Sequence, residues 1–194
     1  MISLNKMSNN LTNIITKDLD YNEDKKEIIA YSIETSLLAV IGTLLLILFA
    51  FIANALKPAL IAALFGVALR KVSGGAHFNT PTKCLIFGAI VYTLLGFLAQ
   101  TLIKYQLNYD YLLWISLASS FLIVIILAPV DSDSKPIHSK RLRNNLKMLS
   151  IVLIIVALII YKVSSEPLLI VSMCLGVLYQ SLTLLPVFNR RGGG

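Results

Sequence analysis

The sequence predicts an all-α, polytopic membrane protein with six transmembrane helices preceded by an N-terminal amphipathic helix. Hydrophobic residues make up 57% of the 194 positions and charged residues only 14%, whereas soluble domains carry about 25% charged residues. The apolar residues gather in runs long enough to cross a hydrocarbon layer about 30 Å thick. These runs lack the residue-by-residue alternation of membrane barrel strands, so we expect helices.

The first part of the chain predicts a surface helix. Apolar residues recur there at helical spacing, with polar residues between them: Leu4, Met7, Leu11, Ile14 and Ile15. Such a helix can lie on the membrane surface or pack as a cap on cytoplasmic loops, and the pattern fits both. We expect residues 1–33 to be an amphipathic cytoplasmic or interfacial segment of a single membrane domain, residues 1–191. The terminal Gly-Gly-Gly, residues 192–194, is set aside as a candidate expression scar.

Six apolar spans follow this segment. They cover residues 37–56, 58–69, 84–103, 111–130, 146–161 and 167–188. The second span is short and is joined to the first by a tight turn at Lys57. Five glycines are spread over the spans and could allow close contact between helices, but none forms a GxxxG pair, so we assign them no specific role: Gly42, Gly66, Gly88, Gly96 and Gly176.

The basic residues predict the orientation of the spans. The connections at 70–83 and 131–147 carry three and five Lys or Arg residues, whereas each of the other three connections carries one. An even number of spans places these two basic connections on the same side as both termini. We expect that side to be the cytoplasmic face of a bacterial plasma membrane.

The connection between the second and third spans holds the candidate catalytic residues. It reads RKVSGGAHFNTPTKC over residues 70–84 and contains His77 and Cys84, one of two histidines and one of two cysteines. Thr80 and Pro81 form a helix start, which places Cys84 in the first helical turn. The unpaired amides and positive dipole end of a helix favour a thiolate there.

Paired glycines precede the histidine. Gly74 and Gly75 break the preceding helix and allow the loop to fold back, so that His77 can reach Cys84. A histidine beside a cysteine is a general-base and nucleophile pair for acyl transfer. The competing interpretation is a loop histidine near an unrelated small residue, and the glycines together with the helix start favour the catalytic pair.

The order of these residues resembles the signature of the accessory gene regulator B (AgrB) family, membrane cysteine endopeptidases of bacterial quorum sensing. The matching positions are Arg70, Gly74, Gly75, His77 and Cys84, and the likeness extends over nearly the whole chain. The resemblance implies cleavage of an AgrD-like precursor peptide, with loss of its acidic C-terminal tail. It implies a nucleophile at Cys84, a base at His77, an acyl-enzyme, and ring closure by an internal cysteine or serine of the peptide to a thiolactone or lactone.

Supporting residues are less defined. Glu34, near the start of the first span, could orient His77 or hold Arg70, or it could simply lie at the water interface. Arg70 could also hold a substrate carboxylate. Ser73, Gly74 and Gly75 are candidates for orienting or supporting roles, and a third catalytic member is left open among candidates that also include Asn79 and Gln180.

A basic cluster follows the fourth span. Its members are candidates for binding the acidic substrate tail: Lys135, Lys140, Arg141 and Arg143. The orientation of the chain or contact with anionic lipid explains the same charges equally well.

Other function classes are less consistent with the sequence. A small transporter or exporter of a peptide or lipid, without protease activity, is the alternative, but the spans hold almost no charge and no pair of broken helices marks a midplane site. A non-enzymatic scaffold is a third class. The absence of an HExxH motif argues against a metalloprotease, and we expect no metal or cofactor.

The remaining expectations concern partners. The net charge of +7 is explained by the positive-inside rule, under which basic residues gather in cytoplasmic connections. Nucleic-acid binding is therefore not expected. We expect membrane lipids and the precursor peptide as partners, and a homodimer through an apolar flank of the bundle. Cys174, within the sixth span, is interpreted as a small buried hydrophobic residue.

Overall fold

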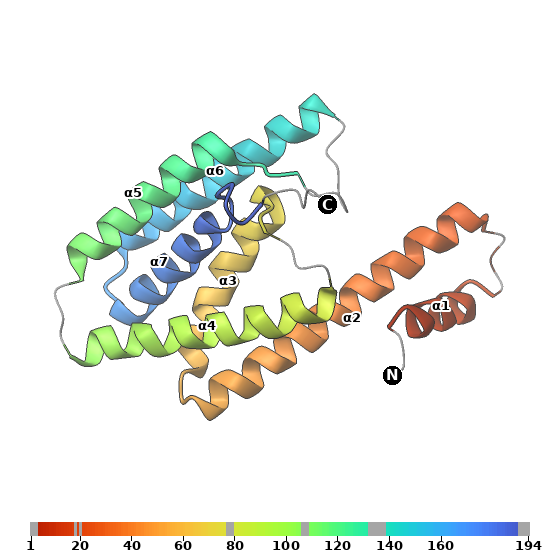
Figure 1. Cartoon of the computed structure of the whole chain (residues 1–194), viewed down its shortest axis with the longest axis horizontal. Helices are drawn as coiled ribbons and strands as arrows, with labels where there is room; N and C mark the ends of the chain where they lie inside the picture. The colour runs from red at the N-terminus through yellow and green to blue at the C-terminus, as the bar shows by residue number, and fades with distance from the viewer. Residues whose placement is uncertain are drawn as a thin grey trace.

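The structure is a computed structural model that describes residues 4–17, 19, 21–76, 80–105, 109–131 and 139–189. All regular secondary structure in these ranges is helical, which confirms the all-α class. Figure 1 shows the helices of this part of the chain: α1 (Leu4–Ile15), α2 (Glu23–Ile52), α3 (Leu56–Ser73), α4 (Pro81–Lys104), α5 (Asp110–Leu127), α6 (Lys140–Val163) and α7 (Pro167–Leu182).

Helices α3 and α7 form the inside of the bundle. Helix α3 packs most extensively against α7 and α4, and α7 also packs against α5 and α4. In Figure 1, α7 lies between α3 and the side formed by α5 and α6. Residues 171–177 of α7 are buried without a break, and Cys174 among them is fully enclosed, as the sequence predicts.

The inner helices approach closely at glycines. A Cβ atom on Gly96 would lie 2.5 Å from the backbone nitrogen of Ala59, and one on Gly176 would collide with the backbone carbonyl of Ala62. Because backbone atoms cannot move aside as a side-chain end can, these two glycines let α4 and α7 lie against α3. Close helix contact at glycines is thus confirmed for Gly96 and Gly176, although no GxxxG pair marks these positions in the sequence.

Four helices are long and apolar enough to cross a membrane, namely α2, α4, α5 and α6. The 16 residues of α7 span only about 24 Å at 1.5 Å per residue. The 18 residues of α3 include Lys57, Arg70 and Lys71. Four such helices indicate a membrane protein, whereas the count of six spans stays a prediction.

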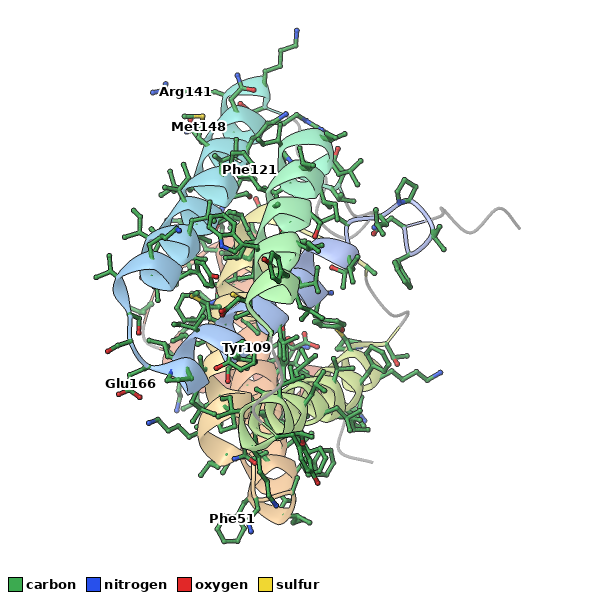
Figure 2. All side chains as sticks on the ribbon, turned by 90° about the vertical axis from the view of Figure 1, so that its left-hand side faces the viewer. Phe51, Tyr109, Phe121, Arg141, Met148 and Glu166 are labelled. Carbon is green, nitrogen blue, oxygen red and sulfur yellow. The ribbon has the colours of Figure 1, made fainter. Side chains whose placement is uncertain are left out.

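The outside of the bundle is apolar. Side chains such as Phe51 and Met148 project away from it (Figure 2), and they are 71% and 62% exposed. Exposed apolar side chains cover much of the long helices, which is the surface expected of helices surrounded by lipid.

The predicted ends of three spans are wrong. The first was expected to reach residue 56 and to turn at Lys57, but α2 ends at Ile52 and Lys57 lies within α3. The fourth span was expected to reach Val130, but α5 ends at Leu127 because Pro129 disfavours helical backbone in the residue before it. The sixth was expected to reach Phe188, but α7 ends at Leu182. Turns follow α7, and the side chain of Asn189 donates hydrogen bonds to carbonyls within them.

Helix α1 packs on α2 through small polar residues. Ser8, Thr12 and Thr16 are buried on the face toward the protein, whereas Ile14 and Ile15 are exposed. Figure 1 shows α1 beside the first half of α2, at one end of the molecule. A helix thus lies where the sequence predicts one, and its contact with a membrane surface stays a prediction.

Candidate functional site

The site lies where α3 ends and α4 begins. Cys84 is partly buried in the first turn of α4, and its amide donates to the carbonyl of Thr80 at 3.3 Å. The sequence correctly predicts the start of α4 at Pro81 with Thr80 as N-cap, although the Thr80 side chain makes no capping hydrogen bond. The thiol therefore lies at the N-terminal end of α4, beside the positive end of the helix dipole.

Arg70, in the last turn of α3, connects the parts of the site. Its Nη2 lies 4.0 Å from the Sγ atom of Cys84 and also donates to the carbonyl oxygen of Ala76. Its Nη1 donates to the side-chain oxygen of Gln180 at 3.4 Å. A guanidinium held between a thiol and a carbonyl places positive charge where a thiolate, or the oxyanion formed by its attack, would need it.

Gly74 and Gly75 end α3 and shape the loop. Their φ angles are 72° and 135°, a region that favours glycine. A Cβ on Gly74 would collide with the carbonyl of Val130, and one on Gly75 would lie 2.6 Å from Oγ1 of Thr183. Both glycines are therefore required by backbone conformation and by space, as the sequence predicts for a loop that folds back.

The loop is fixed to two other parts of the chain. The carbonyl of Ser73 accepts a hydrogen bond from the amide of Val130 at 2.9 Å, and the amide of Ala76 donates to the carbonyl of Thr183 at 3.1 Å. The role of Thr183 depends on its main-chain carbonyl, so the identity of the residue gave no signal for it. The loop leading to His77 is thus tied to the ends of α5 and α7.

Gln180 holds the same loop from α7. It is fully buried, and its Nε2 donates to the carbonyl of Gly74 at 2.7 Å and lies 3.4 Å from Oγ of Ser73. The sequence marks it only as one of several candidates for a third catalytic member. The available signal was a side-chain amide within an apolar run. Because buried polar groups are usually hydrogen-bonded, such an amide predicts polar partners elsewhere in the chain.

Two tyrosines lie near Arg70 and Cys84. The rings of Tyr92 and Tyr179 meet edge to face, with centroids 5.6 Å apart, and both interact electrostatically with Arg70 and Cys84. Gly66 leaves room for the hydroxyl of Tyr92 against α3. No local pattern in the sequence marks these residues, because a tyrosine within an apolar span looks like any other buried aromatic residue.

The structure brings Arg70, Ser73, Gly74, Gly75 and Cys84 together. His77 lies in the segment 77–79, outside the described residues, so its distance to Cys84 stays a prediction. Glu34 is partly buried on α2, and within the described ranges it makes no ion pair with Arg70. Its role toward His77 also stays a prediction.

The basic cluster begins α6. Lys140, Arg141 and Arg143 are exposed there, and Arg141 points away from the bundle (Figure 2). Arg143 pairs with Asp131, the residue after Val130. Because Val130 is bonded to Ser73, the start of α6 is linked to the glycine loop through two contacts. Lys135 lies outside the described residues.

The sequence profile described as accessory gene regulator B matches residues 8–184. The chain belongs to this family. It is 30% identical to putative AgrB-like protein 2 of Clostridium perfringens strain 13, over 90% of this chain and 88% of the relative. It is 33% identical to accessory gene regulator protein B of Staphylococcus intermedius, over 72% of this chain and 71% of the relative. Membership of the AgrB family supports a role in accessory gene regulator quorum sensing. No solved structure matches the chain.

Proposed function

We propose that this AgrB-family protein is a membrane-embedded cysteine endopeptidase that removes the C-terminal tail of an AgrD-like precursor and promotes its cyclisation. One observation carries the proposal. The guanidinium of Arg70 contacts both Sγ of Cys84 and the carbonyl of Ala76, the residue directly before His77. The guanidinium therefore joins the candidate nucleophile to the residue that precedes the candidate base in the sequence.

The first step forms an acyl-enzyme. The Cys84 sulfur attacks the carbonyl carbon of the scissile peptide bond, and His77 takes the thiol proton. The carbon–nitrogen bond then breaks, the tail leaves as an amine with a proton from His77, and a thioester to Cys84 remains. Arg70 lies close enough to Cys84 to stabilise the negative charge that moves from sulfur to oxygen.

The second step closes the ring. A cysteine or serine side chain within the bound peptide attacks the thioester carbonyl, its proton passes to His77, and the Cys84 sulfur leaves and is reprotonated. The product is a thiolactone or lactone. A site at the edge of an apolar bundle limits the access of water, so the internal nucleophile, already close, competes with hydrolysis.

The basic start of α6 supports binding of an acidic tail. Lys140 and Arg141 are exposed, and Arg143 is connected through Asp131 and Val130 to the loop that leads to His77. An anionic tail bound there would contact a segment that is linked to the glycine loop of the site. We place these residues, Lys135 and both termini on the cytoplasmic face of the plasma membrane, in accord with the excess of basic residues in these connections.

The test uses a synthetic AgrD-like precursor with an internal cysteine and an acidic tail, incubated with the purified chain in lipid. We expect Cys84→Ala and His77→Ala to abolish the release of the tail measured by mass spectrometry. The chain offers matched controls, because Cys174→Ala and His138→Ala change the only other cysteine and histidine and should retain cleavage. Cleavage by Cys84→Ala at the rate of the unaltered chain would exclude the proposal.

A further inference from the structure

We propose that Gln180 is a positioning residue that holds Arg70 and the Gly74–Gly75 loop against Cys84. Gln180 lies near the end of α7 and has no exposed surface. Burying an amide without hydrogen bonds costs several kcal/mol, so such a group is retained where its partners matter. Its side-chain partners are Arg70, Ser73 and Gly74, which lie 106 to 110 residues earlier in the chain.

Only a side chain that both donates and accepts fits this position. The Oε1 atom of Gln180 accepts from the guanidinium of Arg70, while Nε2 donates to the carbonyl of Gly74. A carboxylate could accept from Arg70 but could not donate to Gly74, and an apolar side chain could do neither. The side-chain amide of Gln180 therefore connects the Arg70 guanidinium to the Gly74 carbonyl at the C-terminal end of α3.

The connection fixes both sides of Gly75. Gln180 binds the residue before it, and the carbonyl of Thr183 binds the amide of Ala76 after it. Arg70 completes the arrangement, because it bonds to Gln180 on one side and to the carbonyl of Ala76 on the other. The end of α7 thereby sets both the place of the guanidinium beside Cys84 and the direction in which the loop leaves toward residue 77.

The kinetic part of the test rests on the proposed function. We expect Gln180→Met to lower kcat for precursor cleavage by about 10- to 100-fold with little change in KM, since one charge-assisted and one neutral hydrogen bond are lost. Gln180→Glu keeps the size of the side chain and can pair with Arg70, so it should remain folded yet lose activity. Ser172→Ala is the control, because Ser172 is buried on the same helix and its hydroxyl has no hydrogen-bond partner among the described residues.

A second measurement needs no precursor. In a Cys174→Ala background, the rate of Cys84 alkylation by iodoacetamide reports the surroundings of the thiol directly. Gln180→Met should change this rate in the same direction as Arg70→Gln, and the double variant should change it no further, because both act through the same guanidinium. A change produced only by looser packing would add to that of Arg70→Gln.

The two measurements separate the two proposals. Full cleavage by Gln180→Glu, or additive effects on alkylation, would overturn the positioning role even if Cys84 proves to be the nucleophile. Non-additive alkylation in a chain that never cleaves the precursor would support the positioning role and overturn the endopeptidase.

Discussion

The inner helices α3 and α7 differ from the long outer helices in what their side chains do. The outer helices α2, α5 and α6 present mainly large apolar side chains to the surroundings. Helices α3 and α7 contact their neighbours through small residues and provide Arg70 and Gln180 to the site. Helix α4 belongs to both groups, since it is long and apolar but begins with Cys84.

This difference follows from the surroundings of each helix. A helix that faces lipid gains from apolar side chains on its outer surface, whereas an inner helix needs close backbone approach and paired polar groups. Arg70 and Gln180 therefore lie on α3 and α7, which are not among the four candidate membrane spans.

The largest expected effect concerns helix contacts. Gly176→Ala places a Cβ against the backbone of α3, where nothing can move aside, and should lower the free energy of unfolding by about 3 kcal/mol. Gly88→Ala is the matched control, because Gly88 has open space around it. It should be neutral or stabilising by up to about 1 kcal/mol. Unfolding in mixed detergent measures both, and equal losses would contradict the distinction between inner and outer packing.

The next effect compares neighbours at the end of α3. Arg70→Gln removes the positive charge beside the Cys84 thiol and the hydrogen bond to the Ala76 carbonyl. This change should reduce precursor cleavage by about 10- to 100-fold. Lys71→Gln removes the same charge from an exposed position and should change the rate less than twofold. Initial rates at saturating precursor provide the comparison. If both variants lose cleavage activity to a similar extent, the charge of Arg70 serves to orient the chain in the membrane and has no separate role in the site.

A smaller effect is expected at the basic start of α6. Reversing Lys140 and Arg141 to Glu should raise KM for an acidic-tailed precursor by about 5- to 10-fold at low salt, and less at high salt because exposed charges are screened. Lys104→Glu, an exposed change at the end of α4, is the control for charge alone. The amount of inserted protein should be measured in parallel. Equal loss of membrane insertion and of cleavage would indicate that these basic residues orient the chain in the membrane and do not bind the tail.

The smallest effect concerns α1. Thr12→Leu overpacks the buried contact with α2 and should speed amide hydrogen exchange in α1 by about tenfold. Ile14→Ser changes an exposed position and should leave exchange in detergent unchanged, while lowering the protection that lipid adds. Cleavage should change less than threefold in both. If Ile14→Ser leaves lipid protection intact, α1 does not lie on the membrane surface.

The sequence predicted the helical class and each apolar helix because long apolar runs leave few alternatives. It also predicted the loop geometry at Gly74 and Gly75 and the helix start at Pro81, since glycine and proline restrict the backbone locally. Local signals of this kind do not depend on what the rest of the chain does.

Contacts between distant segments were not predictable in the same way. Nothing near Gln180 indicates that its amide binds Arg70, and nothing near Ala62 indicates that Gly176 lies against it. These pairs depend on how helices pack, which one sequence does not encode in any short pattern. The ends of α5 and α7 were missed for a related reason, because apolar residues continue past the point where Pro129 and the turns after Leu182 stop the helix.

The most direct test of the central claim is the intact mass of the protein during turnover of a precursor whose internal cysteine is replaced by alanine. Without that internal nucleophile, the acyl-enzyme should accumulate as a covalent adduct on Cys84. The protein mass should increase by the mass of the peptide without its tail, minus one water. The Cys84→Ala protein should show no such increase. Release of the tail with no adduct on Cys84, and at the same rate in Cys84→Ala, would contradict a cysteine endopeptidase.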